Sequence, residues 1–340
     1  MFGRSKSLLG LDIGSHSVKL VELTQDGDGL FLTAMGRRRL DSPDLAAESV
    51  ADLIDSLGVR TKKCATSVSG RSVIVRYVPM MRLPDEELKA AMAYEADKYI
   101  PFEVDDVVLD CQRLETDEDL GSDQMKVLLV AVKRTLVDDH VNMIEGLGLQ
   151  PTIVDVDVFA LGNAFEQRMQ RLGIEDQTVR GLIDIGSTKL NINIVKGATS
   201  YFTRETYVAG NNITEAVAKR FGEDPSDVER MKEDPGGALE TMQDAIMVVL
   251  EEIGNEIRLS FDYYENQFDE EVTEVYISGG SVQFPGMDSL LANIFNLETR
   301  LWDPSEGVDI TSPKFDPSQL EGTNSDMAVA IGLACRLKDL

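Results

Sequence analysis

The chain has 340 residues, 43% of them hydrophobic, which is enough to bury sizeable cores in roughly two to three compact units. Its 33 basic and 60 acidic residues give a net charge of −27, which repels phosphate backbones and anionic lipid headgroups. We therefore expect no nucleic-acid partner and no direct membrane insertion, although plain solvation or a salty environment would also account for the charge. The three cysteines, Cys64, Cys111 and Cys335, form no Cys-x-x-Cys pair, so neither a zinc site nor a redox motif is expected.

The N-terminal segment lacks the features of a secretion signal. MFGRSKS carries Arg4 and Lys6, and the apolar run that follows is broken by Gly10 and Asp12. Nowhere do about 18 apolar residues follow one another without a charge. We therefore expect a cytoplasmic protein whose association with a membrane comes through a partner.

The first seventy residues predict a small sheet and one helix. Apolar and polar residues alternate in Leu8 to Leu23 on both sides of a glycine turn, which predicts two strands, and Phe31 to Leu40 predicts a third. Helical spacing then indicates a helix at Pro43 to Leu57, and Cys64 to Val68 is typical of a strand.

The next segment predicts a compact α+β insert, because strands and helices follow one another in the order strand, helix, strand, strand, helix, strand. Its acidic stretch, Glu115 to Asp123, is expected to form an exposed hairpin loop. The expected elements are Ser72 to Val78, Pro84 to Tyr99, Val107 to Leu114, Met125 to Val132, Leu136 to Leu147 and a closing strand, Thr152 to Val156.

The opening pattern returns in the second half of the chain. The sequence GLDIGS, at Gly10 to Ser15, is echoed by LIDIGS at Leu182 to Ser187, an offset of 172 residues from Asp12 to Asp184. A strand follows each copy, which indicates two halves of similar construction. The later elements are expected to be helices at Asn212 to Phe221, Pro225 to Met231 and Leu239 to Gln267, a strand at Glu274 to Ser278, and a final helix at Met327 to Leu337.

Each Asp-Ile-Gly-Ser turn suits a phosphate and a metal ion. Glycine lets backbone N–H groups approach phosphate oxygens, and an aspartate at a strand end can hold a hydrated Mg²⁺. One such turn is common, whereas two turns between alternating strands, followed by the strand and glycine pair of Ile277 to Gly280, are specific. The glycine pair permits close approach of a flat base or a ribose.

These motifs, in this order, resemble the actin/Hsp70/hexokinase ATPase superfamily. The phosphate loops would be Asp12 to Lys19 and Asp184 to Lys189, the adenosine motif Ser278 to Gly280, and the connecting helices Asp157 to Phe165 and Asn324 to Ala334. The large insertion of actin has no room between Met35 and Pro43, and the extra module comes later, as in the FtsA-like branch with its subdomain 1C. Within that branch the chain resembles the PilM family of type IV pilus assembly proteins in LLGLDIGSHSVKLVEL, YEADKYIPF, VDVDVFALGNAFE and YISGGSVQFPGM.

This resemblance implies an α/β, actin-like ATPase fold, with two lobes of duplicated mixed sheets and an inserted α+β subdomain 1C. It implies the following division: subdomain 1A at 1–71, 1C at 72–150, a return to 1A at 151–179, 2A at 180–213, 2B at 214–271, 2A again at 272–322, and a C-terminal helix returning to 1A at 323–340.

The resemblance also implies that ATP and Mg²⁺ bind between the lobes, with Asp12 and Asp184 acting on the metal through water. The remaining nucleotide contacts would be Gly14, Ser15, Ser17, Lys19, Gly186, Ser187, Thr188, Lys189, Gly210, Asn212, Gly279 and Gly280. Efficient relatives use Glu or Gln near the first connecting helix to position the attacking water, and here the matching carboxylate is Asp157, one methylene shorter. We expect nucleotide binding with slow turnover or none.

The PilM resemblance implies an adaptor role with several partners. The N-terminal cytoplasmic peptide of PilN would bind in a groove between 1A and 1C near Tyr94, Tyr99, Ile100, Pro101 and Phe102. PilO and PilC would be bound directly or indirectly, and pilus motor ATPases are further candidate partners. Two alternatives remain open: a polymer-forming ATPase similar to FtsA or MreB, and a phosphotransferase similar to sugar kinases.

Overall fold

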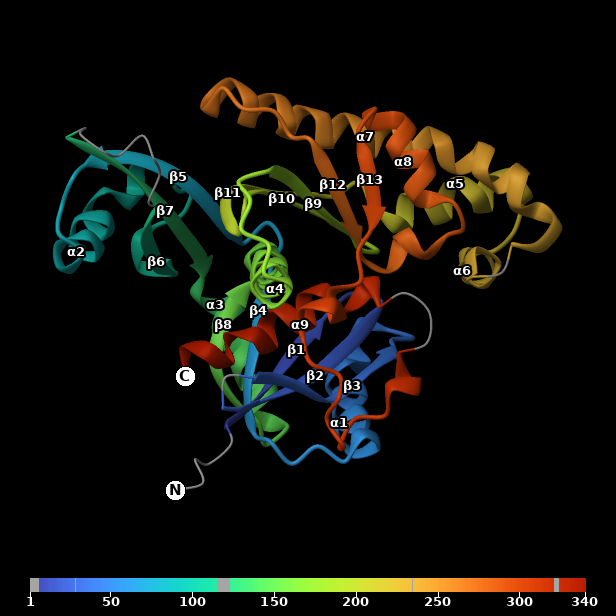
Figure 1. Ribbon diagram of the computed structural model, residues 1–340, viewed down its shortest axis with the longest axis horizontal. Helices are drawn as coiled ribbons and strands as arrows, with labels where there is room; N and C mark the ends of the chain where they lie inside the picture. Colours follow the sequence, from blue (N-terminus) through green and yellow to red (C-terminus); the bar gives the residue numbers. More distant parts are fainter. Residues whose placement is uncertain (1–5, 28, 115–122, 234, 321–323) are drawn as a thin grey trace. The chain divides into compact units, whose positions relative to one another are not determined.

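The computed structural model describes residues 6–27, 29–114, 123–233, 235–320 and 324–340 (Figure 1). The chain divides into two units. The main unit comprises Met1–Ser67 and Leu149–Leu340, and the inserted unit comprises Val68–Gly148, so that the insert begins and ends slightly earlier than the expected 72–150.

The first sheet of the main unit has the strand order β3-β2-β1-β4-β8. Strands β1 (Lys6–Ile13), β2 (Ser17–Asp26) and β3 (Gly29–Arg39) form an antiparallel meander, and β4 (Lys63–Val68) runs parallel to β1. Helix α1 (Ala46–Leu57) packs on β2 and β3 and follows a short turn, Pro43–Leu45, in which the Ser42 hydroxyl accepts a hydrogen bond from the Asp44 N–H. These elements agree with the expected hairpin sheet and helix.

The second sheet repeats this order as β11-β10-β9-β12-β13. It consists of β9 (Val179–Ile185), β10 (Leu190–Lys196), β11 (Thr199–Thr206), β12 (Glu274–Ser278) and β13 (Glu298–Leu301). Strand β9 is antiparallel to β10 and parallel to β12, as β1 is to β2 and β4. The accompanying helices are α5 (Gly210–Phe221), α6 (Pro225–Glu233), α7 (Leu239–Phe268) and α8 (Met287–Phe295). The expected duplication is confirmed, whereas β11 and α8 were not predicted.

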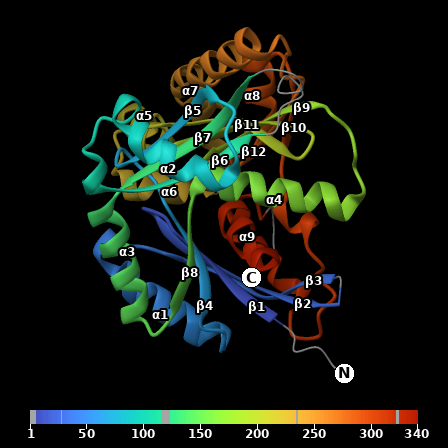
Figure 2. The same ribbon diagram turned by 90° about the vertical axis from the view of Figure 1, so that its left-hand side faces the viewer.

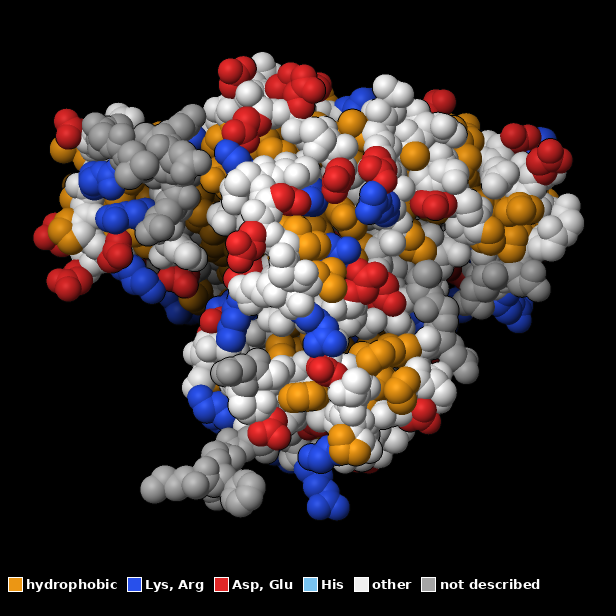
Figure 3. Space-filling model, viewed as in Figure 1, with side chains coloured by type: hydrophobic (Ala, Val, Ile, Leu, Met, Phe, Trp, Pro, Cys, Tyr) orange, Lys and Arg blue, Asp and Glu red, His pale blue; other side chains and the backbone are white. Residues whose placement is uncertain are grey.

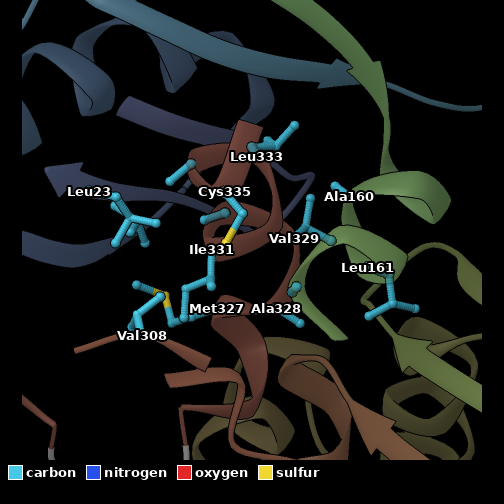
Figure 4. Packing of buried hydrophobic residues seen from close by; sticks show 14 of the residues in the cluster. Leu23, Ala160, Leu161, Val308, Met327, Ala328, Val329, Ile331, Leu333 and Cys335 are labelled. Atoms are coloured by element: carbon cyan, nitrogen blue, oxygen red, sulfur yellow. The ribbon is translucent and has the colours of Figure 1, made fainter. Parts of the chain in front are cut away.

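Two helices lie between the sheets of the main unit (Figures 1 and 2). Helix α9 (Ala328–Cys335) packs on β1 and β2, helix α4 (Asp157–Leu172) packs on β10 and β11, and the two helices pack on each other. Figure 4 shows Ala160 and Leu161 of α4 beside the apolar side chains of α9. Every residue of α9 is buried, which explains why its sequence is apolar on all sides.

The inserted unit has its own three-stranded sheet, in the order β5-β7-β6. Its elements are β5 (Val73–Met81), α2 (Asp85–Glu95), β6 (Val107–Leu114), β7 (Gln124–Lys133) and α3 (Arg134–Gly146), and it has a separate core that includes Val78, Met92 and Leu129. Of the loop expected at Glu115 to Asp123, residues 115–122 lie outside the described residues.

The strand at Thr152 to Val156, which the order of elements assigned to the insert and the resemblance assigned to 1A, belongs to the main unit. It forms β8 (Gln150–Val156), which lies next to β4 in the first sheet. The Gln150 N–H donates to the Lys62 carbonyl at 2.7 Å, and the Thr152 hydroxyl donates to the Cys64 carbonyl at 3.1 Å. The order of elements in the sequence was right, but it does not specify which sheet a strand joins.

Acidic side chains are dispersed among basic ones on the face drawn in Figure 3, without a single large patch of one sign. Across the described ranges, no helix is both long enough and apolar enough to cross a bilayer.

Candidate functional site

The two Asp-Ile-Gly-Ser turns have the same backbone geometry. The Gly14 N–H donates to the Ser17 carbonyl at 3.1 Å, and the Gly186 N–H donates to the Lys189 carbonyl at 3.0 Å. A Cβ added to Gly14 would lie 3.0 Å from the Ser17 oxygen, and one added to Gly186 would lie 3.1 Å from the Lys189 oxygen. Glycine is therefore favoured at both positions because any larger residue would crowd the turn.

The two turns meet in space. The Ser15 hydroxyl lies 2.7 Å from the Ser187 hydroxyl and 3.0 Å from the Thr188 hydroxyl, and either partner of each pair can donate. These hydroxyls come from the two sheets, and the contact joins the halves of the main unit at one point.

A cavity of about 610 Å³ surrounds this contact, a volume typical of sites for small molecules. All but two of the expected nucleotide and metal residues line it: Asp12, Gly14, Ser15, Ser17, Lys19, Asp157, Asp184, Gly186, Ser187, Thr188, Lys189, Gly210 and Gly280. The lining carries carboxylates and basic side chains in close proximity, so that it can hold a polyanion together with a cation.

Asp12 lies near the end of β1 and is paired with Lys19 of β2. The Lys19 Nζ donates to the Asp12 Oδ2 at 2.9 Å, and only 13% and 10% of these side chains are exposed. Burial lowers the pKa of Lys19, but the charges of Asp12 and Asp326 outweigh it, so that this pKa lies above its ordinary value. Lys19 therefore stays cationic at physiological pH.

Asp184 occupies the corresponding place at the end of β9. Its carboxylate accepts hydrogen bonds of 3.2 Å from the Asn191 side-chain amide and of 3.2 Å from the Ser278 hydroxyl. Burial raises the pKa of Asp184, and the charge of Lys19 acts against this rise. The two strand-end aspartates thus have different surroundings, one held by a cation and the other by neutral donors.

Asp157, at the first residue of α4, forms an ion pair with the Lys189 ammonium. Burial lowers the pKa of Lys189, but the charge of Asp157 and its hydrogen bond outweigh this, so that the pKa is raised. The carboxylate expected to position an attacking water is thus engaged by a lysine of the second turn.

The third motif forms one wall of the cavity. Gly280 faces open space, since an added Cβ would meet no atom within 4 Å. The Ser281 hydroxyl donates to the Gly186 carbonyl at 2.9 Å and links this wall to the second turn. Gly210 lies against both Ser281 and Gly186. A Cβ added to Gly210 would lie 2.0 Å from the Ser281 hydroxyl oxygen and 2.9 Å from the Gly186 carbonyl oxygen.

Gly279 and Asn212 do not line the cavity. Gly279 has a φ of 100° and lies against the backbone of Ile185, where an added Cβ would be 2.7 Å from the carbonyl carbon. The Asn212 side chain accepts a hydrogen bond from the Ala209 N–H at 3.0 Å and so caps the start of α5. Both residues shape the wall without facing the cavity.

Several lining residues were not predicted from the sequence as ligands: Arg37, Arg39, Glu229, Lys232, Ser281, Gln283, Phe284, Asp326 and Val329. His16 also lines the cavity, and burial followed by the charge of Arg39 lowers its pKa. Alternation along β3 could have indicated Arg37, because it stands opposite Lys19 in the sheet.

A polar cluster on α6 faces the same cavity. The Lys232 Nζ donates to the Glu229 Oε1 at 2.7 Å and to the Thr214 hydroxyl at 2.9 Å. Burial raises the pKa of Glu229, but the charge of Lys232 outweighs it, so that the pKa is lowered. The wall near Gly210 thus presents an ionised carboxylate beside an ammonium.

The expected partner-binding residues lie in the inserted unit, at the end of α2 and just after it. Tyr94 is 87% exposed, Tyr99 and Phe102 are half-buried, and Pro101 is exposed. Ile100 is 7% exposed and belongs to the core of the unit, so its side chain serves packing. The Lys133 ammonium lies 4.8 Å from the centre of the Phe102 ring.

The donor set fits a hydrated metal ion bound together with a phosphate. Within the described ranges, no three His, Cys, Asp or Glu side chains gather closely enough to hold a metal by themselves. Magnesium typically keeps several waters and takes one or two carboxylates together with phosphate oxygens. Asp12 and Asp184 match that requirement, and the buried Asp326 Oδ1, which has no hydrogen-bond partner, adds an acceptor to the lining of the same cavity.

The fold defines the class of protein. The chain is similar to ethanolamine utilization protein EutJ from Carboxydothermus hydrogenoformans, with 13% identity, a TM-score of 0.56 and coverage of 97% of this chain and 89% of that one. It is also similar to MreB5 of Spiroplasma citri bound to ADP, with 11% identity, a TM-score of 0.53 and coverage of 98% and 97%. At these identities the likeness concerns the fold, which is that of actin-like ATPases.

The family follows from a closer match. Residues 10–338 match the family of the type IV pilus assembly protein PilM, and the chain belongs to this family. It is also similar to a chain in the solved PilM-PilN type IV pilus biogenesis complex, with 29% identity, a TM-score of 0.85 and coverage of 97% of this chain and 98% of that one. The expected fold and family are thus confirmed.

Proposed function

We propose that this chain is an ATP-binding adaptor of type IV pilus assembly, which binds Mg-ATP in the cavity of the main unit and the N-terminal peptide of PilN through the region around α2. The proposed nucleotide binding is supported by the pair of facing glycine turns, each with an aspartate at the end of its strand. The partner part rests on family membership and on the similarity to a chain of the PilM-PilN complex.

The residues around the cavity divide the work by their chemistry. Backbone N–H groups and hydroxyls of the two turns would bind phosphate oxygens, and Lys19 and Lys189 would neutralise their charge. Asp12 and Asp184 would hold the waters of Mg²⁺, which supplies charge neutralisation for the phosphates. The open side of Gly280, in the cavity that Glu229 and Lys232 also line, would receive the base and the ribose.

We expect binding to dominate over hydrolysis. An attacking water needs a carboxylate or an amide that holds it in line with the leaving oxygen. Asp157 is shorter than the usual Glu or Gln, and its carboxylate is paired with Lys189. Nucleotide would then act as a structural ligand or a switch, and a turnover of many per second by the isolated protein would contradict this.

The proposed partner region offers aromatic side chains on a short segment. Exposed Tyr94 and half-buried Tyr99 and Phe102 provide apolar contact area with polar edges, as is usual at protein interfaces. PilN would hold the adaptor on the cytoplasmic face of the inner membrane, and PilO, PilC and the motor ATPases would be further partners of the assembly.

Isothermal titration calorimetry of Mg-ATP, with and without a peptide matching the PilN N-terminus, tests the proposal. We expect saturable ATP binding whose affinity changes when the peptide is present. A Gly280→Val variant should lose nucleotide affinity without a folding defect, because its side chain enters open space in the cavity. Gly237→Val is the matched control, since that glycine also faces open space but does not line the cavity.

Either part of the proposal can fail separately. If Mg-ATP gave no binding at several temperatures while the peptide still bound, the nucleotide role would be wrong. If ATP bound and the peptide did not, the partner assignment would be wrong.

A further inference from the structure

The two halves of the main unit differ in charge at equivalent positions on and beside the cavity. In the first sheet, Asp12 stands opposite Lys19, which stands opposite Arg37. In the second sheet, Asp184 stands opposite Asn191, which stands opposite Glu205. Both sheets thus carry the aspartate. The two residues beside it are basic in the first sheet, whereas in the second sheet one is neutral and the other is acidic.

The contacts follow this difference in charge. The Lys19 Nζ lies 2.9 Å from the Asp12 Oδ2, and the Arg37 Nη1 lies 2.9 Å from the Oδ2 of Asp326, which faces the same cavity. The hydrogen bonds to Asp184 come from an amide and a hydroxyl, both neutral. The carboxylate of Asp12 is therefore already neutralised by the chain itself, and that of Asp184 is held without a cation of its own.

A divalent ion near Asp12 would stand within a few ångströms of the Lys19 ammonium. Repulsion between the two cations is strong there because both residues are almost entirely buried, where solvent screens charges poorly. The ammonium can turn away only if a further anion receives it, because the neighbouring Asp326 is already paired with Arg37. A phosphate group between the two turns is such an anion, and it would also supply oxygen ligands to the metal.

We propose that Lys19 makes binding of a divalent metal at Asp12 conditional on phosphate. Without nucleotide, Lys19 neutralises Asp12 and excludes the metal; with nucleotide, a phosphate accepts the ammonium and frees the carboxylate. This inference rests on the proposed binding of nucleotide in the cavity. It makes Lys19 a positioning residue that couples the two ligands, so that each raises the affinity of the other by the same factor.

The test compares binding of Mn²⁺ alone, and of Mn²⁺ with ADP, to the full chain and to three variants, with free Mn²⁺ followed by electron paramagnetic resonance. Lys19→Gln keeps a neutral donor to Asp12 and so imitates Asn191 of the second half. Lys19→Arg keeps the cation. Arg39→Gln removes a positive charge from the lining of the same cavity but leaves both the pair of Asp12 and Lys19 and the pair of Arg37 and Asp326 in place.

We expect Lys19→Gln to bind Mn²⁺ alone at least tenfold more tightly than the unsubstituted chain, and to lose most of the enhancement by ADP. Lys19→Arg should retain weak binding of Mn²⁺ alone, and Arg39→Gln should change it much less than Lys19→Gln does. Equal affinity of Lys19→Gln and the unsubstituted chain for Mn²⁺ alone, with both folded by circular dichroism, would overturn the inference.

The outcomes separate this inference from the proposed function. If the unsubstituted chain binds Mg-ATP but Lys19→Gln leaves the affinity for Mn²⁺ alone unchanged, only the role of Lys19 is wrong. If the unsubstituted chain binds no nucleotide, the proposed function is wrong, and the coupling to phosphate falls with it. In that case tighter Mn²⁺ binding by Lys19→Gln would still show that the ammonium excludes the metal from Asp12.

Discussion

Gly332 lies where α9 crosses α4, and adding one methyl group there should destabilise the main unit. A Cβ at this position would lie 2.6 Å from the carbonyl carbon of Ala160 and closer still to its oxygen. Ordinary contacts between such atoms are about 3.5–4.0 Å, so the two helices would have to separate by roughly 1–2 Å. Because α9 packs on the first sheet and α4 on the second, the separation would disturb the packing of both.

Two opposing effects set the magnitude for Gly332→Ala. Alanine in place of glycine within a helix stabilises it by about 1 kcal/mol. Overpacking costs about 1–3 kcal/mol and occasionally more, and the upper end applies here because the clash is with backbone, which cannot change rotamer. The expected net loss is about 2 kcal/mol in the free energy of unfolding, which corresponds to a fall of roughly 4–8 °C in Tm for a unit of this size.

Thermal unfolding followed by circular dichroism measures this effect. Gly237→Ala is the matched control, because an added Cβ at Gly237 meets no atom within 4 Å, and we expect its Tm to stay within about 2 °C of the unsubstituted value. A Gly332→Ala variant that unfolds at or above the temperature of the unsubstituted protein would refute the close crossing of α4 and α9.

Two further predictions concern titratable side chains. Burial raises the pKa of Cys64 and of Cys335 to about 12. Ellman's reagent at mildly alkaline pH should therefore react with the partly exposed Cys111 alone in the folded protein, and with all three thiols after unfolding. Fast reaction of Cys64 or Cys335 in native buffer would contradict their burial. Hydrogen bonds from Arg180 lower the pKa of Asp176 to about 2, so the stability that this pair contributes is complete above about pH 4 and is lost as the pH falls towards 2. Asp176→Asn should therefore cost less than about 1 kcal/mol at neutral pH, since the pair is partly exposed, and urea titrations should show the difference shrinking near pH 3; a difference that is constant with pH would argue against the assignment.

The strands next to the glycine turns could be predicted because local patterns suffice there. Alternation of apolar and polar residues marks β1 and β2, and the repeated motif marks β9 and β10. Strand β11 escaped because it lies at the sheet edge and its two buried residues, Thr203 and Thr206, are polar, so that no apolar alternation marks it. Strand β8 was predicted as a strand, but the whole insert separates it in sequence from its partner β4. Pairing between strands so far apart in sequence leaves no local pattern.

The residues of the candidate site also fall into two groups, those that a local motif predicts and those that only the folded chain brings to the cavity. Asp12 and Asp184 could be found because each lies in a recognisable motif. Glu229 and Lys232 line the cavity only because α6 folds back beside it, and no pattern within α6 distinguishes these residues from an ordinary solvated pair. Asn212 was assigned to the nucleotide by the resemblance, but its amide oxygen accepts the hydrogen bond of the helix cap, a local competition that motif matching does not weigh.

The position of the insert in the chain has a consequence for how the first sheet is completed. In the second sheet, the crossover from β12 to β13 is about twenty residues long, with α8 within it, whereas the crossover from β4 to β8 contains the whole inserted unit of about eighty residues. Lengthening a flexible crossover fourfold would cost only about 1 kcal/mol in closure entropy. Since the insert has its own core, it can fold first and bring its two ends to a fixed spacing, so that β8 joins β4 as if the connection were short. The insert then behaves as a cassette in the crossover: replacing it with a single helix like α8 would preserve the strand order of the sheet and remove only the surface that the cassette carries.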